Sequence, residues 1–256
     1  MIDKFAVIHP TAKIGNNVHI GPWTTVGEDV EIGDDTWIGP HVVIQGPTKI
    51  GKNNKIFQFS SLGDAPQDVT YKGEPTRLEI GDNNVIREYC MISRGTVKGG
   101  GLTKIGNDNF LMAYSHIGHD CLVGNEVVMV NYSALSGHVV LKDYAIVGAY
   151  AAIHQFCHVG EYAFIARATY VTKDVLPYVM IAGHTTSACG LNSVGLKRRG
   201  FSADTISNLR RAYKIIFRKG LTVPQALEEL EKLSDESKAI QLMMESLKSA
   251  TRGIVR

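Results

Sequence analysis

Aliphatic residues recur at every sixth position over most of the first 171 residues, often with a glycine immediately after them. A six-residue period fits neither an α-helix nor a strand with one buried face, and it is typical of a hexapeptide β-helix. Three hexads then form one triangular coil, whose aliphatic residues point inward and whose turns lie at the corners. Residues 18 positions apart are therefore stacked neighbours, about 4.8 Å from each other. The recurring positions are Ile8, Ile14, Ile20, Val26, Ile32, Ile38, Ile44, Ile50, Ile56, Leu62, Ile80, Ile86, Ile92, Ile105, Leu111, Ile117, Val123, Met129, Leu135, Leu141, Val147, Ile153, Val159, Ile165 and Val171.

Two stretches interrupt this period. Between Leu62 and Ile80 the sequence is polar and contains glycine and proline, and between Ile92 and Ile105 it contains three consecutive glycines. We expect both stretches to leave the prism as protruding loops, at about residues 63–79 and 93–104. Loops on a rigid scaffold often carry function, although either loop can also be a tolerated insertion.

After about Leu191 the period changes to that of amphipathic helices. Ser202 can cap a helix that ends at Gly220, because the apolar positions between them follow i, i+3, i+7 spacing. Two further helices are expected at residues 222–233 and about 235–250. The sequence thus predicts a mainly β protein, with a left-handed parallel β-helix of hexapeptide repeats over residues 1–190 and a C-terminal α-helical domain over residues 191–256.

The overall composition fits a cytoplasmic globular protein. A formal net charge of +2 gives no basis for nucleic acid binding. The opening MIDKFAVIHP lacks the build of a signal peptide, and no apolar run reaches the roughly 18 residues of a membrane span. Cys90, Cys121, Cys157 and Cys189 lack metal-binding spacing, and the first three occupy the small-residue position of the hexad. We interpret them as packing thiols in a reducing compartment.

A prism filled with aliphatic side chains has no room for a substrate inside it, so any site must lie on its outer surface. A single flat face buries little of a ligand. Prisms of this kind gain clefts when they associate around a three-fold axis, because two subunits then line each site. We therefore expect a homotrimer, with the polar residues that interrupt the hexads marking the cleft.

Four histidines lie close together in the stacking frame, and histidine suits general acid–base chemistry near neutral pH. The 18-residue rule places His119 over Gly137, and Gly137 over Gln155, so three successive coils form one column. Asp120 can orient the adjacent imidazole, and a glycine lets a backbone N–H approach a ligand as an oxyanion donor. A lone histidine would more often be structural, but the column favours catalysis. The four histidines are His116, His119, His138 and His154.

Longer motifs extend along nearly the whole chain. They include MIDK-x-A-x-x-HPTA, QD-x-x-Y-x-GEPTR, RGTV-x-GGGLTK, HI-x-HDC-x-VGN and GLKRRGFS. In these motifs the sequence resembles the UDP-N-acetylglucosamine O-acyltransferases that begin lipid A synthesis. Single hexads occur in many acetyltransferases, but GGGLTK, HDC-x-VGN and GLKRRGFS together are specific. A start directly in hexads also argues against the related N-acyltransferase, which carries an extra N-terminal domain.

This resemblance implies a homotrimer that moves a 3-hydroxyacyl group from acyl carrier protein to the glucosamine 3-hydroxyl of UDP-N-acetylglucosamine, without a metal or other cofactor. His119 matches the family's general base, Asp120 the residue that orients it, and the Gly137 amide the oxyanion donor. The other matching positions surround the sugar, the acyl chain and the nucleotide. They are Gln67, Asp68, His116, His138, His154, Gln155, Asn192, Arg198 and Arg199.

Several positions depart from the family pattern. Thr70, Ser93 and Val194 stand where lysine, histidine and glutamate are common, although Lys72 can supply a charge near the first of them. These changes leave open whether the acceptor is a 3-hydroxyl or a 3-amino sugar. Arg167 stands where the family often has glycine along the acyl groove, so we expect a preference for shorter acyl chains. Alternatively, its side chain turns outward to solvent or to a carboxylate of a neighbouring subunit.

Other classes of protein remain alternatives at this point. A metal-dependent β-helix hydratase would bind zinc through interface histidines, but the H-x-x-H spacing here lacks a third ligand pattern. A non-enzymatic scaffold would have no need of Asp120 beside His119, or of the GLKRR cluster. An acyltransferase for a different nucleotide sugar is the remaining alternative.

Overall fold

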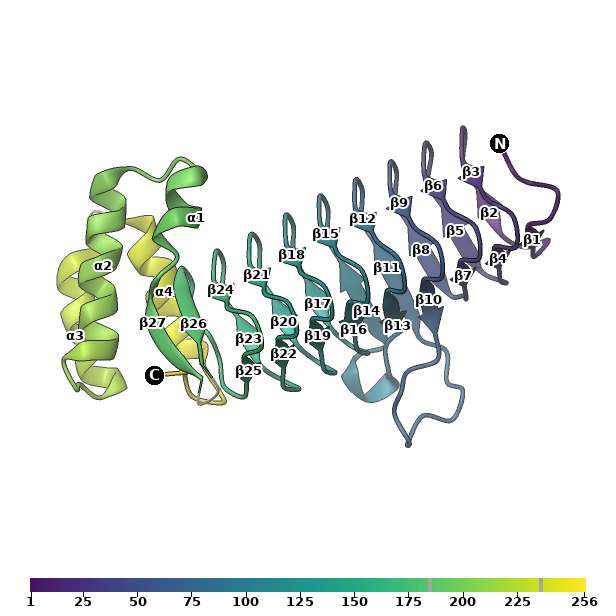
Figure 1. Ribbon diagram of the computed structural model, residues 1–256. Coiled ribbons are helices and arrows are strands. Elements are labelled where there is room, and N and C mark those ends of the chain that lie inside the picture. Colours follow the sequence, from purple (N-terminus) through teal and green to yellow (C-terminus); the bar gives the residue numbers. More distant parts are fainter. Residues whose placement is uncertain (184–185, 235–236) are drawn as a thin grey trace.

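The computed structural model describes residues 1–183, 186–234 and 237–256, and most of the chain is a parallel β-helix (Figure 1). The described residues form three sheets of nine, eight and ten strands, and neighbouring strands in a sheet come from successive coils. The nine-stranded sheet contains β1 (Val7–Ile8), β4 (Thr25–Val26), β7 (Val43–Ile44), β10 (Ser61–Asp64), β13 (Met91–Ser93), β16 (His116–Ile117), β19 (Ala134–Leu135), β22 (Ala152–Ile153) and β25 (Tyr170–Val171). The eight-stranded sheet contains β2 (Lys13–Ile14), β5 (Val30–Ile32), β8 (Thr48–Ile50), β11 (Arg77–Ile80), β14 (Leu102–Ile105), β17 (Leu122–Val123), β20 (Val140–Leu141) and β23 (His158–Val159). The ten-stranded sheet contains β3 (His19–Ile20), β6 (Trp37–Ile38), β9 (Lys55–Ile56), β12 (Val85–Ile86), β15 (Phe110–Leu111), β18 (Val128–Met129), β21 (Ile146–Val147), β24 (Phe164–Ile165), β26 (Val179–Ala182) and β27 (Ser187–Leu191).

The strands pair in the register that the six-residue period predicts. His116 pairs with Ala134, and Ala134 pairs with Ala152, so residues one coil apart are direct neighbours. Where a loop intervenes the sequence offset grows, but the aliphatic positions still meet, as Leu62 does with Ile92. The loops therefore add residues outside the prism without changing its internal stacking.

The core of the prism is the predicted aliphatic series. Ile8 and Ile14 in the first coil are half-buried, and all later members of the series are buried. One corner also contains a buried asparagine ladder. The backbone N–H and side-chain amide of Asn84 donate to Asn54 Oδ1, and those of Asn109 donate to Asn84 Oδ1 in the same way. Every buried amide in this ladder thus has a partner, as a buried polar group requires.

A row of stacked aromatic rings follows the corner between the ten-stranded and nine-stranded sheets. Neighbouring ring centroids in this row lie 4.6 to 6.5 Å apart with nearly parallel planes, and the rings are exposed. From Trp23 onward each residue occupies a left-handed corner position, with φ between 56° and 64°. We call this row the aromatic corner. Its members are Phe5, Trp23, His41, Phe59, Tyr89, Tyr114, Tyr132 and Tyr150.

Two loops protrude from a different corner, between the nine-stranded and eight-stranded sheets (Figure 1). Loop 1 (residues 65–76) connects β10 to β11, and loop 2 (residues 94–101) connects β13 to β14 and contains the short 3-10 helix η1 (Val97–Gly99). Both are a few residues shorter than expected, because the flanking strands extend into their ends. Arg94 fixes the base of loop 1, since its guanidinium donates to the carbonyls of Gly46 and Gly63 and to the Tyr71 hydroxyl.

The C-terminal segment forms four helices among the described residues: α1 (Ser193–Arg198), α2 (Ala203–Arg218), α3 (Val223–Ser234) and α4 (Lys238–Ser249). The sequence did not predict α1, or the antiparallel pairing of β27 with β26 before it. Ser202 caps α2 as predicted, because its hydroxyl accepts from the Thr205 amide at 3.1 Å. The expected start of the last helix near residue 235 lies outside the described residues. Within the described residues, no helix combines the length and the apolar character that a membrane crossing requires.

Candidate active site

The predicted histidine column lies at the corner from which both loops protrude. Residues 119–120 follow β16, residues 137–138 follow β19 and residues 154–155 follow β22, so three successive coils present them along one edge. The stacking of His119 over Gly137 is confirmed, because a Cβ added at Gly137 would lie 2.6 Å from the nearest imidazole carbon. The glycine is therefore needed for the imidazole to lie flat against the backbone of the next coil.

Asp120 is a buried carboxylate held by three donors. Its side chain is 1% exposed. Oδ1 accepts from the Thr96 amide at 2.8 Å, and Oδ2 accepts from the Thr96 hydroxyl at 2.6 Å. Oδ2 also lies 2.8 Å from His119 Nδ1. Because an ionised carboxylate only accepts hydrogen bonds, this contact places the imidazole proton on Nδ1 and leaves Nε2 with a free lone pair.

Loop 2 covers this carboxylate directly. A Cβ added at Gly99 would lie 2.0 Å from the Asp120 carboxyl carbon, so only glycine permits the loop to pass this close. From the other side, the Asp120 amide donates to the Thr103 hydroxyl at 2.8 Å. Asp120 itself has φ of 61°, a left-handed conformation that aspartate tolerates better than most residues. The glycine-rich sequence of loop 2 thus excludes water from the Asp120 carboxylate.

His138 lies beside this pair, in the next coil. Its Nε2 is 3.7 Å from Asp120 Oδ2, and its ring meets His119 edge-on, with centroids 5.1 Å apart. Phe156, one coil further along, stacks on the His138 ring with centroids 4.3 Å apart. Burial lowers the pKa of His138, and the Asp120 charge opposes part of that effect. A largely neutral His138 can therefore donate or accept a hydrogen bond near neutral pH.

His116 projects from the outer face of β16 next to the column. Its Nδ1 is buried and has no hydrogen-bond partner among the described residues. Burial lowers the pKa of His116, and the neighbouring charge of His119 lowers it further. His116 is therefore a largely neutral ring next to the column, and its Nδ1 lies too deep to meet a ligand in this chain.

Loop 1 carries Asp68 toward the same corner. The amide and hydroxyl of Thr70 both donate to Asp68 Oδ1, at 2.8 and 2.9 Å. These hydrogen bonds lower the pKa of Asp68, with smaller contributions from the His119 and Lys98 charges. Lys98 of loop 2 donates to the Thr70 hydroxyl at 2.9 Å, which joins the two loops. The cation that contacts Thr70 is therefore Lys98, and a charge from Lys72 stays a prediction.

The amide of Gly137 is free to bind a ligand. Among the described residues it donates no hydrogen bond. Other coils show why, because proline occupies the equivalent place, two residues after the aliphatic one, at Pro10, Pro22 and Pro40. Proline has no N–H, so the ladder does not need a donor at this place. An N–H without a partner among the described residues, in the glycine packed against the His119 ring, suits an oxyanion donor next to a general base.

Three further predicted residues lie along the same corner, whereas Arg167 lies at another corner of the prism. His154 and Gln155 follow β22, and the half-buried His154 ring lies near Gln155 O, with its Nδ1 3.1 Å away. Gln67 in loop 1 is exposed and its amide contacts Met91. Arg167 is exposed after β24, at the corner between the ten-stranded and nine-stranded sheets, next in line after the aromatic corner.

The predicted nucleotide contacts lie near the third corner. Asn192 caps α1 by accepting from the Gly195 amide, and it donates to the Tyr162 carbonyl at 3.1 Å. Arg199 forms an ion pair with Glu126 and stacks over Tyr144, 4.6 Å from the ring centre. Arg198 is exposed in the last turn of α1. One chain therefore distributes the predicted residues over all three corners.

His119, Asp120 and His138 also have donor atoms within 4.8 Å of one another, close enough to be considered as metal ligands. Their hydrogen bonds argue for a different use. Both carboxylate oxygens already accept from Thr96, and His119 Nδ1 donates to Asp120. Asp120 Oδ2 accepts two of these hydrogen bonds, so a metal ion bound at that oxygen would displace one of the donors. The arrangement therefore fits an acid–base pair better than the zinc site of the hydratase alternative.

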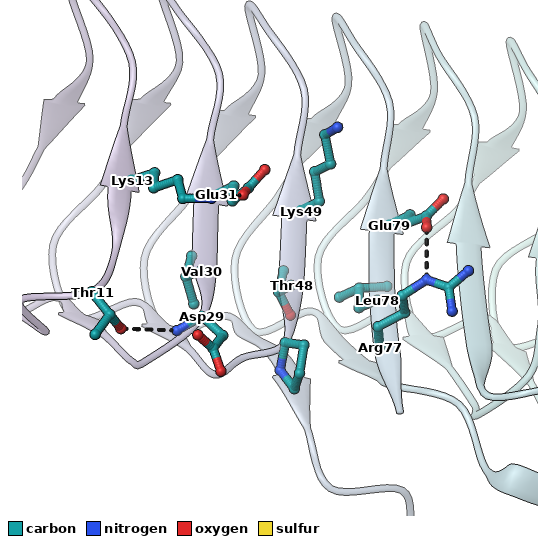
Figure 2. Close-up of a pocket in the computed structure, with 11 residues that line it drawn as sticks. Thr11, Lys13, Asp29, Val30, Glu31, Thr48, Lys49, Arg77, Leu78 and Glu79 are labelled. Atoms are coloured by element: carbon teal, nitrogen blue, oxygen red, sulfur yellow. Dashed lines mark hydrogen bonds and ion pairs between the residues drawn. The ribbon is translucent and has the colours of Figure 1, made fainter. Parts of the chain in front are cut away.

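A separate hollow lies on the outer face of the eight-stranded sheet, near the N-terminus (Figure 2). Its lining is a ladder of alternating charges in which Lys13 pairs with Glu31, and Arg77 pairs with Glu79 at 2.8 Å. These groups neutralise one another, and its lining contains no histidine or cysteine to act as base or nucleophile.

The known proteins that match this chain share its hexapeptide repeats and are acyltransferases. Models described as bacterial transferase hexapeptide (six repeats) match residues 1–28, 29–60 and 102–137, and one described as UDP N-acetylglucosamine O-acyltransferase, domain 2, matches residues 174–255. The acyl-[acyl-carrier-protein]–UDP-N-acetylglucosamine O-acyltransferase of Saccharophagus degradans is 51% identical, covering 100% of this chain and 99% of the relative. The solved LpxA structure from Acinetobacter baumannii is 46% identical with a TM-score of 0.98, covering 100% and 99%. The Arabidopsis UDP-N-acetylglucosamine acyltransferase structure is 33% identical with a TM-score of 0.85, covering 100% of both chains.

The repeats and the histidine–carboxylate pair on their outer corner define a hexapeptide-repeat acyltransferase. The full-length similarity is more specific: the chain belongs to the UDP-N-acetylglucosamine O-acyltransferase family. The predicted family, the acyltransferase class and the left-handed parallel β-helix are thus confirmed. Thr96, Thr103, Lys98 and Phe156 were not singled out from the sequence. The 18-residue rule places Phe156 one coil after His138, so this residue could have been found from the sequence. No period describes the positions of Thr96 and Lys98 in loop 2.

The low pKa of His116 makes stability depend on pH. Because its pKa is lowered in the folded state, the unfolded chain takes up a proton first as the pH falls below about 6.5. This contribution to the free energy of unfolding is fully present above that pH and decreases below it. We expect the unfolding midpoint to fall between about pH 7.5 and about pH 5.5, and to fall less in His116→Gln. Thermal unfolding measures this; the matched variant His9→Gln, at an exposed position, should behave like the wild type, and equal pH dependence in His116→Gln would contradict the assignment.

Proposed function

We propose that this protein transfers a 3-hydroxyacyl group from acyl carrier protein to the glucosamine 3-hydroxyl of UDP-N-acetylglucosamine, the first step of lipid A biosynthesis. The observation that carries the proposal is the contact of His119 Nδ1 with the buried Asp120 carboxylate at 2.8 Å, with the Gly137 amide beside the free Nε2. Relatives about half identical over their whole length bear the corresponding name. No metal or other cofactor is required, since base, oxyanion donor and activated thioester suffice.

In the proposed mechanism, His119 Nε2 removes the proton of the sugar hydroxyl as its oxygen attacks the thioester carbonyl. Asp120 holds the imidazole in the required tautomer and stabilises the imidazolium that forms. The carbonyl oxygen becomes negatively charged in the tetrahedral intermediate and accepts from the Gly137 N–H. When the intermediate collapses, the C–S bond breaks and the imidazolium returns its proton to the thiolate of acyl carrier protein. A new C–O ester bond remains on the sugar.

The other predicted residues are proposed as substrate contacts. His116 and His138 present neutral rings next to the base, and Asp68 is ionised at the rim. His154 and Gln155 continue the same edge for the acyl chain, together with Gln67 from loop 1. Asn192, Arg198 and Arg199 are proposed to meet the nucleotide, because a guanidinium fork suits a diphosphate.

We propose that the acceptor atom is the oxygen of the sugar 3-hydroxyl. Three positions, Thr70, Ser93 and Val194, depart from the family pattern, and they are the reason to consider a 3-amino sugar as well. Thr70 is joined to Lys98, Ser93 is buried at the end of β13, and Val194 is exposed on α1. None of them contacts His119 or Asp120, so both acceptors are compatible with the same base. Mass spectrometry of the product separates them, since an ester is cleaved by mild alkali and an amide is not.

We propose that the active unit is a homotrimer in the cytoplasm. The base, Arg167 and Arg199 lie at three different corners of one prism, so a single chain cannot bring them to one substrate. Copies packed side by side around a three-fold axis place the corner of one subunit against a different corner of the next. The exposed aromatic corner supplies the apolar surface for such packing. Four free cysteines, three of them buried, suit a reducing compartment.

The base assignment predicts the kinetics of two variants. His119→Ala should lower kcat by about 10²–10⁴-fold, because general base catalysis typically contributes that much. Asp120→Ala should cost less, since it orients the ring and does not take the proton. Turnover is measured by mass spectrometry of product from UDP-N-acetylglucosamine and 3-hydroxyacyl thioesters of acyl carrier protein. The unfolding midpoint of His119→Ala should stay near that of the wild type, and a folded variant that keeps more than about a third of wild-type kcat would remove His119 from this role.

The trimer is testable without kinetics. Light scattering coupled to size exclusion should give about three times the 28.0 kDa mass of one chain. Tyr132→Glu and Tyr114→Glu, in the exposed aromatic corner, should reduce this mass because they place charge in the proposed interface. The matched surface change Leu122→Glu, on the outer face of the eight-stranded sheet, tests whether the effect is specific to that corner. A stable monomer with full activity would contradict both the trimer and the site shared by two subunits.

The role of Arg167 is tested with donors of increasing acyl length. If its guanidinium enters the acyl groove of a neighbouring subunit, Arg167→Gly should shift the maximum of kcat/KM toward longer 3-hydroxyacyl donors. Arg167→Lys, which keeps the charge and most of the length, should keep the wild-type profile. In one chain Arg167 is exposed, which also suits the alternative of an outward-facing interface residue. If the length profile is unchanged in Arg167→Gly, that alternative is supported and Arg167 does not limit the acyl length.

A further inference from the structure

Thr96 donates two hydrogen bonds to the Asp120 carboxylate, more than any other described residue does. Its backbone N–H donates to Oδ1 at 2.8 Å, and its hydroxyl donates to Oδ2 at 2.6 Å. The second contact involves the same oxygen that faces His119 Nδ1. Thr96 is 3% exposed, so these hydrogen bonds are shielded from water. A carboxylate with both oxygens held in this way cannot rotate about its Cβ–Cγ bond without losing charge-assisted hydrogen bonds.

The sequence of loop 2 places Thr96 in this position. Its hydroxyl oxygen also accepts from the Gly99 amide at 3.2 Å, so Thr96 is the N-cap of η1. Its carbonyl accepts from the Gly101 amide at 2.7 Å, which closes the loop around it. Gly100 and Gly101 have φ of 93° and 78°, a left-handed conformation that glycine adopts without strain. The three consecutive glycines are thus explained by the tight return of the chain around the Thr96–Asp120 contact.

We propose that Thr96 is a positioning residue for the reaction: it acts through Asp120, whose carboxylate oxygen Oδ2 it holds against Nδ1 of His119. This inference rests on the proposed function of His119 and Asp120. Loss of the hydroxyl leaves Oδ2 with a single donor and frees the carboxylate to rotate away from Nδ1. The imidazole then loses the partner that fixes its tautomer, so the chemical step slows while substrate contacts elsewhere stay in place.

The variants Thr96→Val and Thr96→Ser separate the hydroxyl from the shape of the side chain. Valine keeps the volume and the backbone N–H, and serine keeps the hydroxyl. Thr96→Val should lower kcat by about 10-fold or more, because a hydrogen bond to a charged group is removed, with KM for UDP-N-acetylglucosamine changed by less than about twofold. Thr96→Ser should restore kcat to within about threefold of the wild type.

Thr24→Val is the matched control. The Thr24 hydroxyl is also buried, donates to the Gly39 carbonyl at 2.7 Å and accepts from the Val42 amide at 3.1 Å, far along the prism from the site. Its loss should lower the unfolding midpoint without changing kcat by more than about twofold. If Thr96→Val does not fold, Thr96→Ala, which removes the hydroxyl without adding a methyl group, takes its place. An unchanged kcat in the folded hydroxyl-free variant, or an equal loss in the serine variant, would overturn the proposal.

A double-mutant cycle with Asp120→Ala shows whether Thr96 acts through the carboxylate. In the absence of Asp120, removing the Thr96 hydroxyl should lower kcat by less than about twofold further, because the group it positions is gone. Effects that multiply would overturn the inference. A large loss in Asp120→Ala with none in Thr96→Val refutes the role of Thr96 alone. Wild-type kcat in both His119→Ala and Asp120→Ala refutes the proposed base, and with it any positioning role.

Discussion

Everything in this protein depends on the in-register stacking of very short parallel strands. Most strands are two residues long, so no strand is stable by itself, and each coil is held only by the coils above and below it. The aliphatic residue that points inward fixes the register, since a shift by one residue would move it to the outer face. The residue three positions later then turns through a left-handed corner, as Asp120 and His138 do. The repeat therefore sets where catalytic side chains can lie, and spaces them one coil apart.

The site adds what the repeat alone does not offer, a buried charge. An ionised carboxylate with 1% exposure is costly unless donors replace the lost water. The regular corner provides only backbone groups, and the side chain of Asp120 would point into solvent. Loop 2 returns over this corner, supplies two donors from one residue and closes with glycine directly above the carboxyl carbon. The second interruption of the hexads is therefore what buries and holds the Asp120 carboxylate, and this favours a function for loop 2 over a tolerated insertion.

A contact in this structure could be predicted from the sequence where it follows the 18-residue stacking rule or a local motif. The aliphatic core, the histidine column, the stacking of His119 on Gly137 and the cap at Ser202 all follow a fixed period or a local motif, so they could be predicted. The contact of Thr96 with Asp120 could not, because it spans a loop whose path no period describes. The contact of Lys98 with Thr70, which also joins two loops, was missed for the same reason. The 18-residue rule also predicts that Arg167 lies at another corner than His119. Whether Arg167 and Arg199 reach the same substrate as His119 depends on how copies of the chain pack.

Both loops leave the prism at a corner, and this shows where such a chain can gain or lose residues without disturbing the stacking of its coils. Deleting one hexad between His119 and Gly137 would rotate every later residue by one sheet, so that Gly137 would no longer lie below His119. Deleting three hexads would shorten the prism by a coil and keep all columns aligned. Residues added at a corner, as in loops 1 and 2, lengthen the chain without any rotation. A lineage of such proteins is thus free to differ in whole coils and in corner loops, whereas partial coils between loop 2 and the C-terminal helices would separate the catalytic residues from one another.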